Sequence, residues 1–161
     1  MDVERHALAL TTSTPEETEA LGERLGLALA GTTLIALDGD LGAGKTCFVR
    51  GLARGLGVVE PVSSPTYALL QSYTGRLQLH HLDAWMEGRE RAFLLDGGLE
   101  WIASRGVTVI EWAERVGDLL PTPRISIRIE RLSADLRVIH CALVGPESST
   151  GALAHALAAL A

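Results

Sequence analysis

The chain has 161 residues, with fourteen Lys plus Arg, twenty Asp plus Glu and a formal net charge of −6. Thirteen of the fourteen basic residues are Arg and one, Lys45, is Lys, which excludes a second active-site lysine and a lysine-rich nucleic-acid patch. The acidic balance argues against direct binding of DNA or RNA, and the length and composition predict one domain over residues 1–161.

The N-terminal residues lack the basic-then-apolar pattern of a signal peptide. The uncharged run between Arg24 and Asp38 has thirteen residues, fewer than the roughly 17 to 25 that span a bilayer. We therefore expect a cytoplasmic protein with no membrane-spanning segment. Cys47 and Cys141 are far apart and have no metal-ligand spacing, so we expect two buried, reduced thiols.

Strand-like and helix-like patterns alternate along the chain, which indicates an α/β fold with some antiparallel strand pairs. A hydroxyl cap candidate, a first-turn proline and early acids in Ser13-Thr14-Pro15-Glu16-Glu17 predict the start of the first helix. The apolar patterns predict strands over residues 3–11, 34–37, 68–73, 77–82, 107–110, 125–130 and 136–144. The predicted helices span residues 13–30, 45–56, 89–105 with a break at 97–98, 112–121 and 151–161.

Residues 39–46 match the P-loop pattern, here Gly39-Asp40-Leu41-Gly42-Ala43-Gly44-Lys45-Thr46. Glycines let the backbone turn its N–H groups inward around a polyphosphate, and the helix that follows directs its positive end at the same anion. We expect Lys45 to contact the β- and γ-phosphates of ATP and the Thr46 hydroxyl to bind Mg²⁺. The sequence thus predicts a single P-loop NTPase domain, with a central mixed sheet, helices on both faces and a C-terminal antiparallel hairpin.

A P-loop protein also needs an acid that holds the Mg²⁺ shell or the attacking water. Asp83 and Glu111 each stand at the end of a predicted apolar strand, where ligands bind in doubly wound sheets. Each could instead cap a helix. The cleaner apolar run before Glu111 makes it our first choice, but the sequence pattern does not decide which acid lies closer to the metal.

Two further features lie between the P-loop and Glu111. Ser63-Ser64-Pro65-Thr66-Tyr67 is either a loop that senses the γ-phosphate or a plain structural turn. His80 and His81 are adjacent strand residues that face opposite ways, which makes metal ligation by both improbable. His81 shares a face with Asp83 and is a candidate to orient that carboxylate or a water molecule.

In this order the motifs resemble the signature of the TsaE (YjeE) family, which are bacterial P-loop ATPases of tRNA threonylcarbamoyladenosine synthesis. The resemblance extends from the helix start at residues 13–18 to Arg137. It rests on the P-loop of residues 39–46, Ser64-Pro65-Thr66-Tyr67, His81-Leu82-Asp83 and Ile110-Glu111-Trp112-Ala113-Glu114.

The resemblance implies a small cytoplasmic ATPase that binds the TsaD–TsaB pair and meets tRNA only through that complex. It implies that Lys45 and the loop amides hold the ATP phosphates, while Thr46 and Glu111 contact Mg²⁺. Asp83 would support the metal or the water. The remaining implied site residues are Thr66 in the switch-like loop, Trp112 beside the acid, Ser13 near the base, and Arg137, a recurrent late arginine whose role stays open.

One departure concerns the residues after His-x-Asp, where the family usually has Leu-Tyr-Arg and this chain has Ala84-Trp85-Met86. A function of the missing arginine is therefore in doubt, or belongs to Arg89 or Arg91. The main rival function is a nucleoside or small-metabolite kinase of the P-loop type, with an arginine lid from Arg89, Arg91 and Arg105. A third possibility is a nucleotide-dependent interaction module with negligible hydrolysis, which overlaps with the function that the family resemblance implies. A GTPase is nearly excluded, because its guanine-reading motif needs a second lysine.

Overall fold

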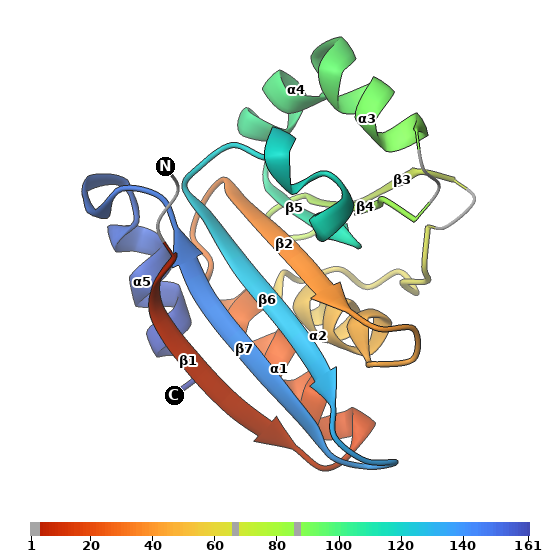
Figure 1. The fold of residues 1–161 in the computed structure, drawn as a ribbon, viewed down its shortest axis with the longest axis vertical. Helices are drawn as coiled ribbons and strands as arrows, with labels where there is room; N and C mark the ends of the chain where they lie inside the picture. Colours follow the sequence, from red (N-terminus) through yellow and green to blue (C-terminus); the bar gives the residue numbers. More distant parts are fainter. Residues whose placement is uncertain (1–3, 66–67, 86–87) are drawn as a thin grey trace.

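In the computed structural model, residues 4–65, 68–85 and 88–161 are described, and they form a seven-stranded mixed sheet (Figure 1). The strands lie in the order β1-β7-β6-β2-β5-β4-β3. The central strands β6, β2, β5 and β4 are parallel, whereas β1, β7 and β3 pair antiparallel with their neighbours. Their bounds are Glu4–Thr12 (β1), Thr33–Gly39 (β2), Leu70–Tyr73 (β3), Leu79–Asp83 (β4), Val107–Glu111 (β5), Arg124–Arg131 (β6) and Arg137–Val144 (β7).

Helices cover both faces of the sheet, as predicted (Figure 1). On one face lie α1 (Pro15–Ala28), α2 (Lys45–Gly55) and α5 (Gly151–Ala158). On the other lie α3 (Arg89–Phe93), the π turn η1 (Leu94–Gly98) and α4 (Leu99–Ala103). Non-helical dihedral angles at Asp96 and Gly97 confirm the predicted break, shifted by about one residue. A short 3-10 turn, η4 (Glu147–Ser149), precedes α5.

The predicted helix over residues 112–121 is wrong. Two 3-10 turns occupy this segment, η2 (Ala113–Arg115) and η3 (Gly117–Leu119). Trp112 has a left-handed backbone with φ of 58°, so a regular helix cannot begin at that residue. Gly117 and Pro121 further restrict the length of any helix here. The chain therefore turns sharply after β5, and Trp112 stays at the carboxyl end of this strand.

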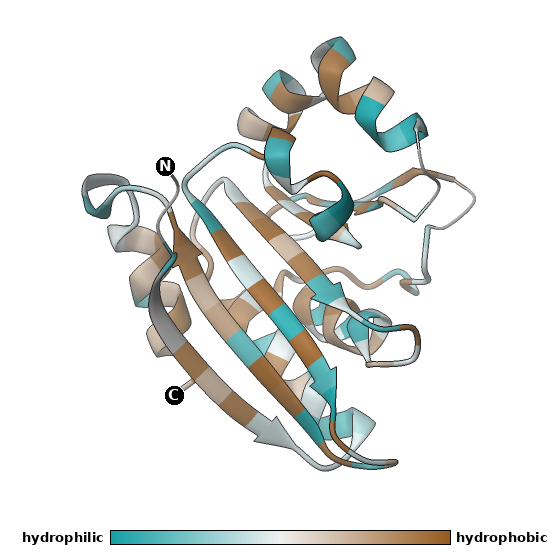
Figure 2. Ribbon diagram, viewed as in Figure 1, coloured by the Kyte–Doolittle hydropathy of each residue, from teal (hydrophilic) through white to brown (hydrophobic). Residues whose placement is uncertain are grey.

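The inner parallel strands β2, β5 and β4 are buried on both faces, which explains why β2 and β5 are mostly apolar. Every residue of β4 and β5 is buried. On β6, by contrast, hydrophilic and hydrophobic residues alternate (Figure 2), because one face of this strand packs on the core and the other is open. No helix among the described residues is long and apolar enough to cross a membrane.

Glycines bring α1 and α2 unusually close together. A Cβ atom at Gly51 of α2 would lie 1.8 Å from the carbonyl oxygen of Glu19 in α1, and one at Gly22 of α1 would lie 2.2 Å from the carbonyl oxygen of Phe48. The backbones thus touch where side chains would normally separate them. This contact fixes the position of α2, whose first turn follows the P-loop.

A buried histidine gives the fold a dependence on pH. His80 is buried on β4, where its Nδ1 lies 2.8 Å from Ser72 Oγ and its ring packs edge-on against Trp101 at 4.3 Å. Burial, with a smaller contribution from the Arg105 charge, lowers the pKa of His80. The unfolded chain therefore binds more protons as the pH falls through about 6.5, and the free energy of unfolding should fall with it.

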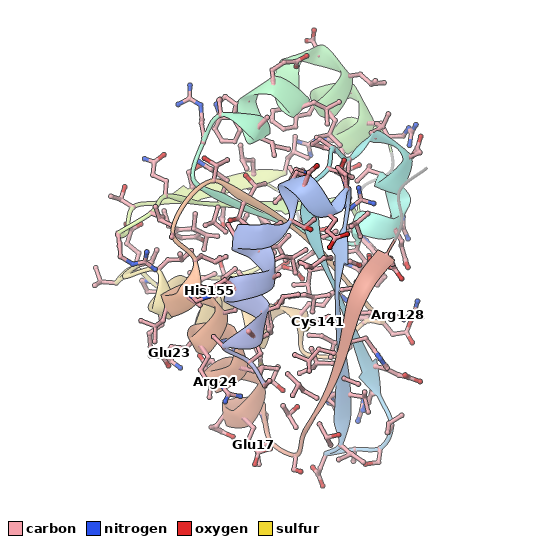
Figure 3. The ribbon with its side chains drawn as sticks, turned by 90° about the vertical axis from the view of Figure 1, so that its left-hand side faces the viewer. Glu17, Glu23, Arg24, Arg128, Cys141 and His155 are labelled. Atoms are coloured by element: carbon pink, nitrogen blue, oxygen red, sulfur yellow. The ribbon has the colours of Figure 1, made fainter. Side chains whose placement is uncertain are left out.

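Urea denaturation between pH 7.5 and 5.5 measures this effect. His80→Gln should flatten the decrease in the free energy of unfolding, because its side chain does not titrate. His155→Gln is the matched control, since His155 lies exposed on α5 (Figure 3). Equal pH slopes in His80→Gln and the wild-type protein would contradict the prediction.

Candidate functional site

The P-loop joins the end of β2 to the start of α2, as the sequence predicts. Gly42 and Gly44 have φ angles of 78° and 113°, in the left-handed region that favours glycine. The cap residue of α2 is Gly44, and no side chain caps this helix. The first N–H groups of α2 have no intrahelical carbonyl partner, so they can donate to an anion.

Lys45 is buried at the first position of α2. Its ammonium group donates to the carbonyl oxygens of Gly39 and Asp40, at 3.0 Å for Asp40, and lies 3.9 Å from the centre of the Trp112 ring. Burial lowers the pKa of Lys45. The nearby carboxylates, Glu111 first and then Asp83, oppose that shift. The Lys45 side chain thus lies close to the carboxylates of Glu111 and Asp83.

The two candidate acids lie side by side. Asp83 and Glu111 are register partners on the neighbouring parallel strands β4 and β5, so their side chains leave the same face of the sheet about 4.8 Å apart along the strand spacing. The Asp83 carboxylate accepts hydrogen bonds from Ser64 Oγ at 3.3 Å and from the Trp85 N–H at 2.8 Å. These bonds orient the carboxylate toward the cleft that it lines.

His81 contacts Glu111 rather than Asp83. Its Nε2 pairs with Glu111 Oε2, and both residues are buried. The hypothesis that His81 orients the Asp83 carboxylate is therefore replaced by one in which it orients Glu111. On the neighbouring parallel strands Glu111 lies two residues beyond Val109, the register partner of His81, so the contact is diagonal across the sheet. The local sequence does not reveal this relation.

These groups line one cleft of about 540 Å³, within the range for small-ligand sites. The phosphate-binding loop, the two acids and an aromatic rim converge on it. Its lining residues are Leu41, Gly42, Gly44, Lys45, Thr46, Cys47, Ser64, Asp83, Trp85, Glu111 and Trp112. Predicted site residues from both halves of the chain thus meet here. Thr66 lies outside the described residues.

A smaller pocket of about 220 Å³ adjoins the cleft and shares Gly42, Gly44 and Cys47 with it. Thr14, the N-cap of α1, lines this pocket, whereas the neighbouring Ser13 does not. The Ser13 N–H instead donates to the Glu17 carboxylate at 2.5 Å. Thr14, and not the predicted Ser13, therefore lines this pocket.

Arg137 also lines the smaller pocket and supports the P-loop. Its Nε donates to the carbonyl oxygen of Ala43 at 2.9 Å, and its Nη1 donates to the Ser133 and Ala134 carbonyls in the β6–β7 turn. The arginine thus links the hairpin to the P-loop. Gly39 and Asp40 enter the site through their carbonyl oxygens, which hold Lys45.

Three neighbouring residues were not selected from the sequence as site residues. Trp85 packs against Trp112 with ring centroids 4.6 Å apart, and it is 41% exposed at the rim of the cleft. Cys47 lines both pockets and is only half-buried, so the expectation of two buried thiols is wrong for this residue. Asp38 accepts a hydrogen bond from the Glu114 N–H at 2.8 Å. The sequence offers a signal for Trp85, because it stands where the family motif has an aromatic residue. It offers no signal for Asp38.

Within residues 4–65, 68–85 and 88–161, no group of three His, Cys, Asp or Glu side chains is arranged to hold a metal ion. The side-chain oxygen donors at the cleft include two carboxylates, Asp83 and Glu111, and the hydroxyls of Thr46 and Ser64. Such oxygen donors suit Mg²⁺, which usually keeps several water ligands and binds substrate phosphates with only one or two carboxylates.

Comparisons with known proteins agree with this arrangement. A family model described as "Threonylcarbamoyl adenosine biosynthesis protein TsaE" matches residues 12–139. The chain is 44% identical over 116 residues to the tRNA threonylcarbamoyladenosine biosynthesis protein TsaE of Treponema pallidum, covering 71% of this chain and 86% of the relative. It is 38% identical over 136 residues to the protein of that name from Bacillus subtilis, with 83% and 84% covered.

A solved structure extends the likeness to almost the whole chain. The crystal structure of Bacillus subtilis YdiB superposes with a TM-score of 0.77 and 33% sequence identity, covering 97% of each chain. The family model spans most of the chain, including the P-loop and both acids. The chain therefore belongs to the TsaE family, whose members take part in tRNA threonylcarbamoyladenosine biosynthesis.

Proposed function

We propose that this protein binds and slowly hydrolyses Mg²⁺–ATP, and that it supports threonylcarbamoyl modification of adenosine in tRNA by acting on the TsaD–TsaB pair in the cytoplasm. The observation that carries the proposal is the convergence of the P-loop lysine, Thr46 and two in-register acids on one cleft. Family membership supports the pathway.

The phosphate end of ATP would lie at the start of α2. There the unpaired N–H groups and the Lys45 ammonium can donate to phosphate oxygens, once Lys45 leaves the carbonyls of Gly39 and Asp40. The base would extend into the smaller pocket, between Thr14 on α1 and Arg137 on β7. Because the two pockets share three lining residues, one nucleotide could occupy both.

The two acids would both help to hold Mg²⁺, and Glu111 has a second possible role. Thr46, Asp83 and Glu111 would hold Mg²⁺, directly or through its water ligands, and the ion would neutralise charge on the phosphates. Glu111 can also accept a hydrogen bond from the attacking water, with its carboxylate fixed by His81. Ser64 and the Trp85 N–H hold the Asp83 carboxylate in its orientation.

The test is ADP release by the purified protein alone, with TsaD and TsaB, and with a panel of nucleosides and sugars. We expect a slow rate alone and a faster rate with the partner pair. Phosphorylation of a small acceptor without the partners would instead support the rival kinase function. Two arginines suggested for a kinase lid are engaged elsewhere, since Arg91 pairs with Asp118 at 2.8 Å and Arg105 lies 5.4 Å from the Trp101 ring centre.

Alkylation provides an independent test of where the nucleotide lies. Cys47 lines both pockets, whereas Cys141 is buried and burial raises the pKa of its thiol to about 12. A maleimide should therefore modify Cys47 alone in the native protein. Mg²⁺–ATP at a saturating concentration should slow this modification at least about tenfold, measured by intact mass spectrometry. An unchanged rate would contradict the proposed nucleotide position.

A further inference from the structure

Asp38 lies outside the cleft and connects the strand that precedes the P-loop with the turn η2 that follows Trp112. It follows the buried part of β2 and directly precedes Gly39, the first residue of the P-loop. Its Oδ1 accepts a hydrogen bond from the Glu114 N–H at 2.8 Å, across 76 positions of sequence. The side chain does not line the 540 Å³ cleft but a separate groove of about 310 Å³, together with Glu114, Arg124 and Ser126.

The hydrogen bond stabilises a turn that has no local cap. Glu114 lies in the 3-10 turn η2, which begins after Trp112 and has no side-chain cap of its own. The N–H groups in the first turn of a helix need a partner from elsewhere. Asp38, on strand β2, supplies that partner for the Glu114 N–H.

The same turn contains a strained residue. Trp112 has φ of 58° and ψ of 36°, a left-handed conformation that is unfavourable for a residue other than glycine. Such a conformation persists only where its surroundings fix it. Two contacts flank it here, the Asp38 bond to Glu114 and a 3.1 Å hydrogen bond from Arg115 Nη1 to the Trp85 carbonyl.

Trp112 in turn contacts the phosphate site. Its ring lies 3.9 Å from the Lys45 ammonium and packs against Trp85. A tryptophan face attracts a nearby cation, with an energy that increases when water is excluded. A continuous series of contacts therefore runs from Asp38 through the Glu114 amide and Trp112 to Lys45.

We infer that Asp38 is a positioning residue: through the Glu114 N–H it holds the left-handed turn that keeps Trp112 over Lys45. The expected effect of Asp38 on nucleotide binding rests on the proposed function. Its role in holding the turn at Trp112 does not depend on that function. Asp38 does not line the cleft. Its hydrogen-bonded route to Lys45 runs through the Glu114 N–H and Trp112, and its charge also acts on Lys45 directly. Burial raises the pKa of Asp38, and the hydrogen bond from the Glu114 N–H, followed by the charges of Arg128 and Lys45, partly opposes that shift. Arg128 lies on the open side of the sheet (Figure 3).

The experiment compares Asp38→Ala, Asp38→Asn and Asp38→Glu with the wild-type protein. Near-ultraviolet circular dichroism reports the packing of the Trp85–Trp112 pair, and titration with a fluorescent ATP analogue reports affinity. Asp38→Ala should lose much of the tryptophan dichroism and bind the nucleotide about tenfold more weakly. Asp38→Asn should stay within about threefold of wild type, because its amide oxygen can still accept the Glu114 N–H.

Asp38→Glu should resemble Asp38→Ala, since the added methylene moves the carboxylate oxygen away from Glu114 while it keeps the charge. Two matched controls, Ser126→Ala in the same groove and Glu114→Gln, which retains the N–H donor, should leave dichroism and affinity unchanged. Should Asp38→Ala fail to fold, the contrast between Asn and Glu carries the test.

Wild-type dichroism in Asp38→Ala, or rescue by Glu but not by Asn, would overturn the inference. Absence of nucleotide binding by the wild-type protein would overturn the proposed function instead. In that case the dichroism of the variants would still decide whether Asp38 positions Trp112.

Discussion

Lys45→Ala is expected to weaken ATP binding about 100-fold or more and to abolish turnover. A hydrogen bond from a charged group contributes about 1.5 to 3 kcal/mol, and 2.8 kcal/mol corresponds to about 100-fold. Removal of Lys45 also leaves Glu111, Asp83, Asp38 and Asp40 without the nearby cation that offsets their charges. The phosphates of ATP would then meet an acidic pocket, which adds repulsion to the lost contact.

Lys45→Arg should not restore turnover, because a planar guanidinium does not fit where a compact ammonium reaches two loop carbonyls. The matched control is Arg54→Ala on the same helix. Arg54 pairs with Glu23 at 2.9 Å on the surface, where such pairs contribute about 0 to 1 kcal/mol. Calorimetric titration of ATP and an ADP-release assay measure both quantities. Unchanged affinity in Lys45→Ala would mean that the P-loop assignment is wrong.

The sequence predicts the parts of this site that depend on local patterns. Continuous apolar runs identify the buried parallel strands, and the glycine spacing of residues 39–46 specifies a loop between a strand and a helix. Asp83 and Glu111 directly follow the strand-like segments 77–82 and 107–110, so their place at the ends of strands could be predicted. That they lie side by side follows from the register of β4 and β5.

Contacts between distant segments could not be predicted in this way. His81 meets Glu111 across 30 positions, Asp38 meets Glu114 across 76, and Arg137 meets Ala43 across 94. Each depends on strand order, which a single sequence specifies only weakly. The failed helix prediction over residues 112–121 has the same origin, because long-range support allows Trp112 a backbone conformation that local preference disfavours.

The close contact of α1 and α2 leads to the second large effect. Gly51→Ala should lower the free energy of unfolding by about 3 kcal/mol or more, at the upper end of the usual cost of overpacking. Its Cβ would lie 1.8 Å from the Glu19 carbonyl oxygen and 3.0 Å from the Glu23 nitrogen, and both are backbone atoms that cannot rotate away. The helices would have to separate.

Urea denaturation measures this loss, with Gly31→Ala as the matched control. An added Cβ at Gly31 meets nothing within 4 Å, so this change should alter stability by less than about 1 kcal/mol. Helix separation should also reach the site, because Thr14 and Thr18 of α1 line the smaller pocket opposite the P-loop. A folded Gly51→Ala protein should therefore bind ATP more weakly even at temperatures where it is fully native. Wild-type stability together with wild-type affinity in Gly51→Ala would contradict the prediction. It would mean that the two helices can move apart without cost.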